Sequence, residues 1–174
     1  ESPVGKSVLK QIIENDDIAA REKIAICQDT GMAVVFVELG QEVQIVDGDF
    51  NEAINRGVRE AYTAGYLRKS VVSDPLFDRK NTKDNTPAII HVNIVPGDKV
   101  RITVTAKGFG SENMSSLKML KPADGVEGVK RFVVETAINA GPNPCPPIIV
   151  GVGIGGTMEM AAILSKKAIL RPIG

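Results

Sequence analysis

The sequence has few cysteines, no excess charge of either sign and no long apolar run, and each shortage excludes a class of protein. Lysine plus arginine and aspartate plus glutamate both number 21, so the formal net charge is zero. A surface that binds nucleic acid or anionic lipid would carry a clear basic excess. No apolar run approaches the roughly 20 residues of a membrane-spanning helix, and the N-terminus lacks the pattern of a secretory signal. We therefore expect a cytoplasmic protein with no nucleic-acid or membrane partner.

The two cysteines, Cys27 and Cys145, lie far apart in the sequence. They could form a disulfide in a secreted protein, but without a signal sequence we favour reduced thiols. Two thiols are too few for a zinc site of four ligands. The single histidine, His91, lies in a predicted strand, where core packing is its ordinary role.

The composition predicts one globular domain, because 43% of the 174 residues are hydrophobic and 24% are charged. Helical spacing predicts a first helix over about 6–20, and a β-branched apolar run predicts a buried strand over 33–39. Asp49 with Glu52 forms a box-like N-cap pattern, which predicts a second helix running to Ala64 and ending at Gly65.

The segments 88–95 and 99–106 flank a Pro-Gly-Asp-Lys turn and predict a β-hairpin. Before them, residues 68–86 form a long polar loop, and loops of that length tend to be functional. The remaining elements predicted from spacing are helices at about 112–120 and 125–140, a strand at 148–152 and a helix ending near Leu170. The fold predicted over residues 1–174 is α+β, with mixed or antiparallel small sheets including a hairpin at about 88–106, packed with about five helices.

The glycines from Gly151 to Gly156 satisfy the G-x-G-x-x-G spacing of a dinucleotide-binding turn. That interpretation also needs an acidic residue about 20 positions further on, which falls beyond Gly174. A tight strand-to-helix turn is the favoured interpretation, and a nucleotide-binding module remains an alternative.

The run Cys27-Gln28-Asp29-Thr30-Gly31 places a thiol, an amide and a carboxylate side by side. This set suits metal ligation together with substrate contact, although a half-buried cysteine before a turn is the plainer alternative. Around Cys145, prolines on both sides fix the backbone and remove amide donors.

Five segments, in this order along the chain, resemble the class I (iron–sulfur) fumarate hydratase and L-tartrate dehydratase family, in its alpha subunit or N-terminal domain. They are Cys27-Gln-Asp-Thr-Gly31, Lys80-Asn-Thr-Lys-Asp-Asn-Thr-Pro87, Lys107-Gly-Phe-Gly-Ser-Glu-Asn113, Cys145-Pro-Pro147 and Gly151-Val-Gly-Ile-Gly-Gly-Thr157.

The resemblance implies a hydro-lyase that hydrates fumarate to malate or dehydrates tartrate, with a [4Fe–4S] cluster held by three cysteines. Cys27 and Cys145 match two of these ligands. The third is absent here, so we expect the C-terminal segment that carries it to be missing and a two-thiol site to hold the cluster poorly. The resemblance also implies a beta subunit or C-terminal catalytic domain, a homo- or hetero-oligomer, and no activity for this chain alone.

The same resemblance implies roles for five residues around a small dicarboxylate substrate. Asp29 would transfer a proton and contact the substrate with Gln28; Arg68 would bind a carboxylate; Gly108 and Gly110 would bring backbone amides against it. An Asp that caps a turn and an ordinary exposed arginine are the plain alternatives for Asp29 and Arg68. Many relatives carry a third glycine where this chain has phenylalanine. A non-catalytic assembly subunit that has lost its cluster is the remaining alternative for the whole chain.

Overall fold

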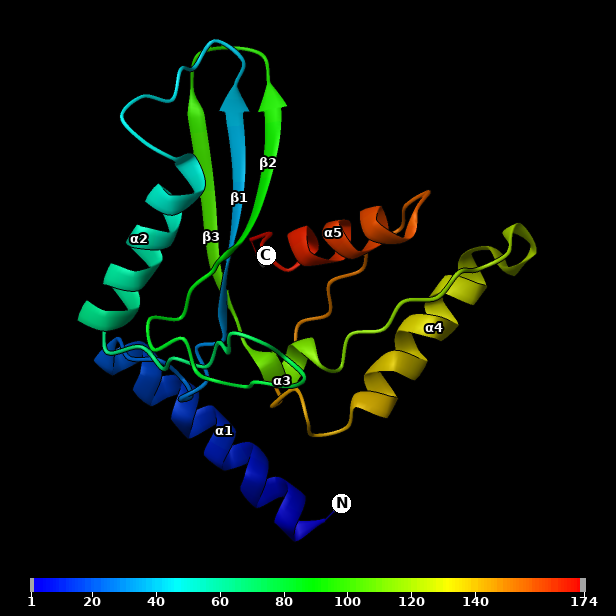
Figure 1. Ribbon diagram of the computed structural model, residues 1–174. Helices are drawn as coiled ribbons and strands as arrows, with labels where there is room; N and C mark the ends of the chain where they lie inside the picture. The colour runs from blue at the N-terminus through cyan, green and yellow to red at the C-terminus, as the bar shows by residue number, and fades with distance from the viewer. Residues whose placement is uncertain (1, 173–174) are drawn as a thin grey trace. The chain divides into compact units, whose positions relative to one another are not determined.

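A computed structural model describes residues 2–172 (Figure 1). The chain divides into two compact units, one up to Ala106 and one from Lys107 on. The described residues form five α-helices and one small mixed sheet, so the α+β class predicted from the sequence is confirmed. The helices are α1 (Pro3–Glu22), α2 (Phe50–Ala64), α3 (Phe109–Glu112), α4 (Gly125–Ala140) and α5 (Met158–Ala168), with a 3-10 turn at Pro122–Asp124, and the strands are β1 (Met32–Gly40), β2 (Ile89–Val95) and β3 (Val100–Lys107).

The sheet of the first unit has β1 in its centre, between β2 and β3 (Figure 1). β1 and β2 are parallel, with Val34 opposite Ile89 at one end and Gly40 opposite Val95 at the other. The backbone N–H of Gly40 donates to the carbonyl of Lys99 at 2.8 Å. β3 therefore starts where β1 ends and runs in the opposite direction.

The predicted hairpin at 88–106 is wrong in its pairing, although both strands exist within a residue of their expected bounds. β2 and β3 do not pair with each other, because β1 lies between them. The turn 96–99 crosses over the end of β1 at Gly40. A Cβ atom on Gly40 would lie 2.8 Å from the Lys99 nitrogen and closer still to the Gly97 oxygen, so only glycine fits beneath the turn.

The core of the first unit lies between α2 and one face of the sheet. The predicted N-cap is confirmed, since Asp49 Oδ1 accepts the N–H of Glu52 at 2.7 Å, and the helix ends before Gly65 as expected. α2 buries Val58 and Tyr62, which are one turn apart and so lie on the same side of the helix. The core residues are Ala33, Val35, Val37, Val58, Tyr62 and Ala88.

In the second unit, α4 has the bounds predicted from its spacing. Two other expectations are wrong: the helix predicted at about 112–120 is absent, the short helix α3 lying at Phe109–Glu112 instead, and residues 148–152 form no strand. Across residues 2–172, the helices are too short or too polar to span a bilayer.

Candidate functional site

The loop between α1 and β1 carries Cys27, Gln28 and Asp29. Cys27 is exposed and not in a disulfide, and its Sγ lies 3.9 Å from the carbonyl oxygen of Asp29 as a weak donor. Gln28 is exposed and Asp29 is half-buried. The loop therefore leaves a thiol and a carboxamide accessible, with a carboxylate beside them.

Arg68 lies in a second loop that contacts the first. Its backbone N–H donates to Thr30 Oγ1 at 3.2 Å, across 38 positions of sequence, and the residue is exposed. The structure thus brings Arg68 and the Cys27–Gly31 loop into neighbouring positions in the first unit.

Tyr62 reaches the same loop from α2. Its hydroxyl donates to the carbonyl of Gly31 at 3.3 Å. The pKa of Tyr62 is raised. Burial is the main cause, a hydrogen bond with Asn85 acts to lower the pKa, and the Asp29 carboxylate adds to the rise. Tyr62 therefore contacts the end of the loop that carries Asp29.

Asn85 is hydrogen-bonded to both loops. It has no exposed surface. Its side-chain oxygen accepts the N–H groups of Ser70 at 2.7 Å and Val71 at 3.1 Å. Its Nδ2 donates to the carbonyl of Gly31 at 2.9 Å. One buried amide therefore ties the segment after Arg68 to the end of the Cys27–Gly31 loop.

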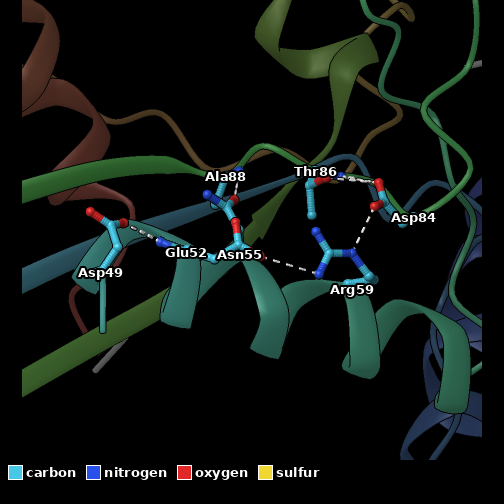
Figure 2. Close-up of polar contacts among 7 residues, drawn as sticks. All are labelled: Asp49, Glu52, Asn55, Arg59, Asp84, Thr86 and Ala88. Atoms are coloured by element: carbon cyan, nitrogen blue, oxygen red, sulfur yellow. Dashed lines mark hydrogen bonds and ion pairs between the residues drawn. The ribbon is translucent and has the colours of Figure 1, made fainter. Parts of the chain in front are cut away.

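The residues on both sides of Asn85 are fixed to α2, as Figure 2 shows. Arg59 Nε donates to Asp84 Oδ2 at 2.9 Å, and Asn55 Oδ1 accepts the N–H of Ala88 at 2.8 Å. Burial acts to raise the pKa of Asp84, but the N–H and hydroxyl of Thr86 and the Arg59 guanidinium outweigh it and hold the pKa at about 2. Asp84 is therefore ionised at neutral pH and anchors its segment to the helix.

In the second unit, the Gly108–Gly110 segment adjoins the loop of the other cysteine. A Cβ atom on Gly110 would lie 3.1 Å from the carbonyl oxygen of Asn143. Cys145 is exposed, its backbone is left-handed with φ of 59°, and its Sγ lies 3.9 Å from the same oxygen. The two glycines and the second candidate ligand are therefore neighbours within this unit.

Sequence reasoning missed two lysines that hold this segment. Lys107 Nζ donates to the Gly108 carbonyl at 3.0 Å and lies 3.5 Å from Glu112 Oε2. Lys166, on α5, forms an ion pair with the same carboxylate. Burial acts to raise the pKa of Glu112, but Lys166 and then Lys107 outweigh it, so the pKa is lowered. Lys107 and Glu112 lie inside a recognised motif, but no sequence signal linked Lys166, 54 positions further on.

The glycines between Gly151 and Gly156 pack against α5. A Cβ atom on Gly153 would come within 3.0 Å of the Ala161 oxygen and the Ser165 nitrogen, both backbone atoms of the helix. At Gly156, by contrast, a Cβ atom would meet nothing within 4 Å. The close approach of this segment to α5 explains Gly151, Gly153 and Gly155 but not Gly156, which supports the tight turn over the nucleotide-binding interpretation.

Over residues 2–172, no three His, Cys, Asp or Glu side chains gather into a group that could hold a metal ion. Cys27 belongs to the first unit and Cys145 to the second.

The model of the family described as "Fumarate hydratase (Fumerase)" matches residues 1–174. The chain belongs to this family. It is 47% identical over 179 residues to the "Putative L(+)-tartrate dehydratase subunit alpha" of Methanocaldococcus jannaschii, an alignment that covers 99% of this chain and 62% of the relative. It is 37% identical over 177 residues to the "L(+)-tartrate dehydratase subunit alpha" of Escherichia coli strain K12, covering 99% of this chain and 57% of the relative. The chain thus spans about three fifths of the length of these curated relatives.

Proposed function

We propose that residues 1–174 form the cluster-binding alpha domain of an iron–sulfur hydro-lyase that reversibly hydrates fumarate to malate or dehydrates tartrate. The family match over every residue of the chain carries this proposal. The neighbouring loops of Cys27 and Arg68 support it, because they combine a thiol, a carboxylate and a guanidinium in one unit.

The cofactor we propose is a [4Fe–4S] cluster with Cys27 and Cys145 as two of its ligands. Both thiols are free and exposed, as a cluster ligand must be before assembly. The donor set fits in part, since the third thiolate would come from outside these 174 residues, which contain two cysteines. When bound, the cluster would supply an iron that polarises a substrate oxygen as a Lewis acid.

The chain's own side chains would bind the substrate and move its proton. The planar guanidinium of Arg68 suits a substrate carboxylate, which it can hold with two parallel N–H···O bonds. In dehydration, the Asp29 carboxylate takes the proton from the carbon next to the one that loses its hydroxyl. The C–H electrons form the double bond, the hydroxyl leaves with the C–O electrons, and the hydroxyl and the proton together make up the released water. Hydration is the reverse. Gln28 contacts the substrate beside it, and Gly108 and Gly110 offer backbone N–H groups.

A beta subunit or a C-terminal catalytic domain would complete the site. The curated relatives are named as alpha subunits of L(+)-tartrate dehydratase, and the chain spans about three fifths of them. We expect a homo- or hetero-oligomer that works in the cytoplasm, where thiols such as Cys27 and Cys145 stay reduced.

The test is anaerobic reconstitution of the complete protein, with its partner, using iron and sulfide, followed by turnover of fumarate, tartrate and methyl-substituted fumarates. We expect visible iron–sulfur absorbance and hydro-lyase turnover, and loss of both in Cys27→Ser and Cys145→Ser. A folded complex with neither absorbance nor turnover would instead identify a non-catalytic assembly subunit.

Two further variants separate the roles of the binding and proton-transfer groups. Asp29→Asn should keep the cluster absorbance and lower kcat by roughly 100- to 10,000-fold, the usual contribution of a positioned base. Arg68→Lys should raise KM, because a lysine cannot make the paired bonds. Arg79→Lys is the matched control, since Arg79 is an exposed arginine of the same long loop. An equal effect of the two lysine variants would contradict the role of Arg68.

A further inference from the structure

We propose that Asn85 is a positioning residue that holds the loop of Cys27 and Asp29 in register with the loop of Arg68. This inference rests on the proposed function, in which Cys27 is the cluster ligand, Asp29 the base and Arg68 the carboxylate-binding group. Asn85 would set the spacing between them. Asn85 itself touches neither substrate nor cofactor.

Both ends of the Asn85 side chain are hydrogen-bonded. An asparagine side chain has an oxygen that accepts two bonds and a nitrogen that donates two. The Asn85 oxygen accepts from Ser70 and Val71, and the nitrogen donates to Gly31. The left-handed backbone at Asn85, with φ of 62°, is one that asparagine tolerates better than most residues. Both the backbone and the side chain therefore favour asparagine here.

Asn85 is itself held in place by its neighbours in the sequence. Asp84, before it, is paired with Arg59, and Ala88, after it, is bonded to Asn55 (Figure 2). Both partners lie on α2, which packs on the sheet through the main core. Asn85 thus transmits the position of the scaffold to two loops that have few other ties to each other.

The other direct bond between the two loops is the N–H of Arg68 to Thr30 Oγ1 at 3.2 Å, and both residues are at least partly accessible to water. Water can replace that bond, but it cannot reach Asn85, which has no exposed surface. A shift of about 1 Å in a catalytic group can lower the rate about 100-fold. The buried bonds of Asn85 therefore contribute more to the spacing of the two loops than the accessible bond from Arg68 to Thr30.

The decisive variant is Asn85→Asp, because it keeps the shape and changes one atom. While the introduced carboxyl is neutral, its O–H can donate to Gly31 and its carbonyl can accept from Ser70 and Val71. Once it ionises, it still accepts from those two N–H groups but faces the Gly31 carbonyl with a second acceptor. Burial raises the pKa of such a carboxyl and the N–H groups of Ser70 and Val71 lower it, so the loss should appear as the pH rises through that pKa.

We expect kcat/KM of Asn85→Asp, divided by that of the wild type at each pH, to fall roughly 10- to 100-fold as pH rises. Taking the ratio cancels the pH dependence that the variant shares with the wild type. Asn81→Asp is the matched control: Asn81 Nδ2 also donates to a carbonyl, that of Lys69 at 2.9 Å, but the residue is exposed. Its ratio should stay flat.

A second readout does not need turnover. In the assembled full-length protein, amide hydrogen exchange of residues 27–31, corrected for intrinsic rates, should quicken with pH in Asn85→Asp and not in Asn81→Asp. If the wild type turns over no dicarboxylate, the proposed function fails. The exchange measurement still tests whether Asn85 holds the two loops. If Asn85→Asp does not fold, Tyr62→Phe, which removes the other donor to Gly31, should quicken the same exchange by roughly two- to five-fold. Unchanged exchange and a flat activity ratio would overturn the proposal.

Discussion

Replacing single glycines by alanine in the run 151–156 separates backbone packing from anion binding. In Gly153→Ala the new methyl group would come within 3.0 Å of two backbone atoms of α5, the Ala161 oxygen and the Ser165 nitrogen. Neither is the movable end of a side chain, so the helix or the segment must shift. In Gly155→Ala the closest backbone atom, the Ala161 nitrogen, would be 3.1 Å away, and in Gly156→Ala no atom lies within 4 Å.

The expected free energies of unfolding follow this order. Overpacking against a rigid neighbour costs about 1–3 kcal/mol and at times more, so Gly153→Ala should lose about 2–4 kcal/mol. Gly155→Ala should lose about 1 kcal/mol. Gly156→Ala should be neutral or gain up to about 1 kcal/mol, because alanine restricts the unfolded chain at a backbone position it can adopt.

The assay is unfolding by urea and by heat, followed by circular dichroism on the same preparation of each variant. A loss of 2–4 kcal/mol in a protein of this size lowers the melting temperature by about 5–15 °C. If Gly153→Ala were as stable as the wild type, the packing interpretation would be refuted. If Gly156→Ala were the only variant to lose binding of a phosphate-bearing ligand, the nucleotide interpretation would regain support.

Three further predictions concern the scaffold. The free energy of unfolding of Gly40→Ala, measured in urea, should fall by about 2–4 kcal/mol, because the methyl group meets the backbone of the crossing turn. Gly57→Ala, which has open space on α2, should instead gain about 0.5–1 kcal/mol. Equal stabilities of the two variants would contradict the packing at Gly40. Asp84→Asn should lose about 1–2 kcal/mol near pH 7, and since the folded pKa of Asp84 is about 2, below its unfolded value of 3.8, the difference should vanish as pH falls from about 4 to 2. Glu112→Gln should lose about 1–2 kcal/mol at low salt, less in 1 M salt, because the charge of Lys166 is left without its partner; a loss independent of salt would rule out an electrostatic cause.

Local patterns predicted most helices and strands because their causes are local, but the predicted helix at about 112–120 and the predicted strand at 148–152 are absent. The cap of α2 depends on Asp49 and an amide three residues away, and the bounds of α4 follow from spacing within the helix. The pairing of β2 and β3 could not be predicted in this way. A turn of four residues is equally compatible with direct pairing and with a crossing over a third strand, and the deciding contact is with Gly40, more than fifty positions earlier.

In the candidate site, too, sequence motifs identified the segments but could not show which of their residues are buried. Motifs identified the Cys27–Gly31 and Arg68 segments, and the structure brings them together in one unit. The motif Lys80–Pro87 marked a segment but could not tell its buried asparagine from its exposed one. Asn85 and Asn81 have the same side chain in the same segment, and only three-dimensional burial separates them.

The polar contacts of the first unit link the rigid helix α2 to the accessible loops of Cys27 and Arg68. α2 is fixed by the core; Arg59 and Asn55 transfer its position to residues 84–88; Asn85 transfers it again to the two loops. The contacts to α2 are part-buried, whereas the bond from Asn85 to Gly31 is fully buried and is therefore the most costly to break. The exposed thiol and guanidinium at the far end therefore owe their placement to residues that never meet a substrate.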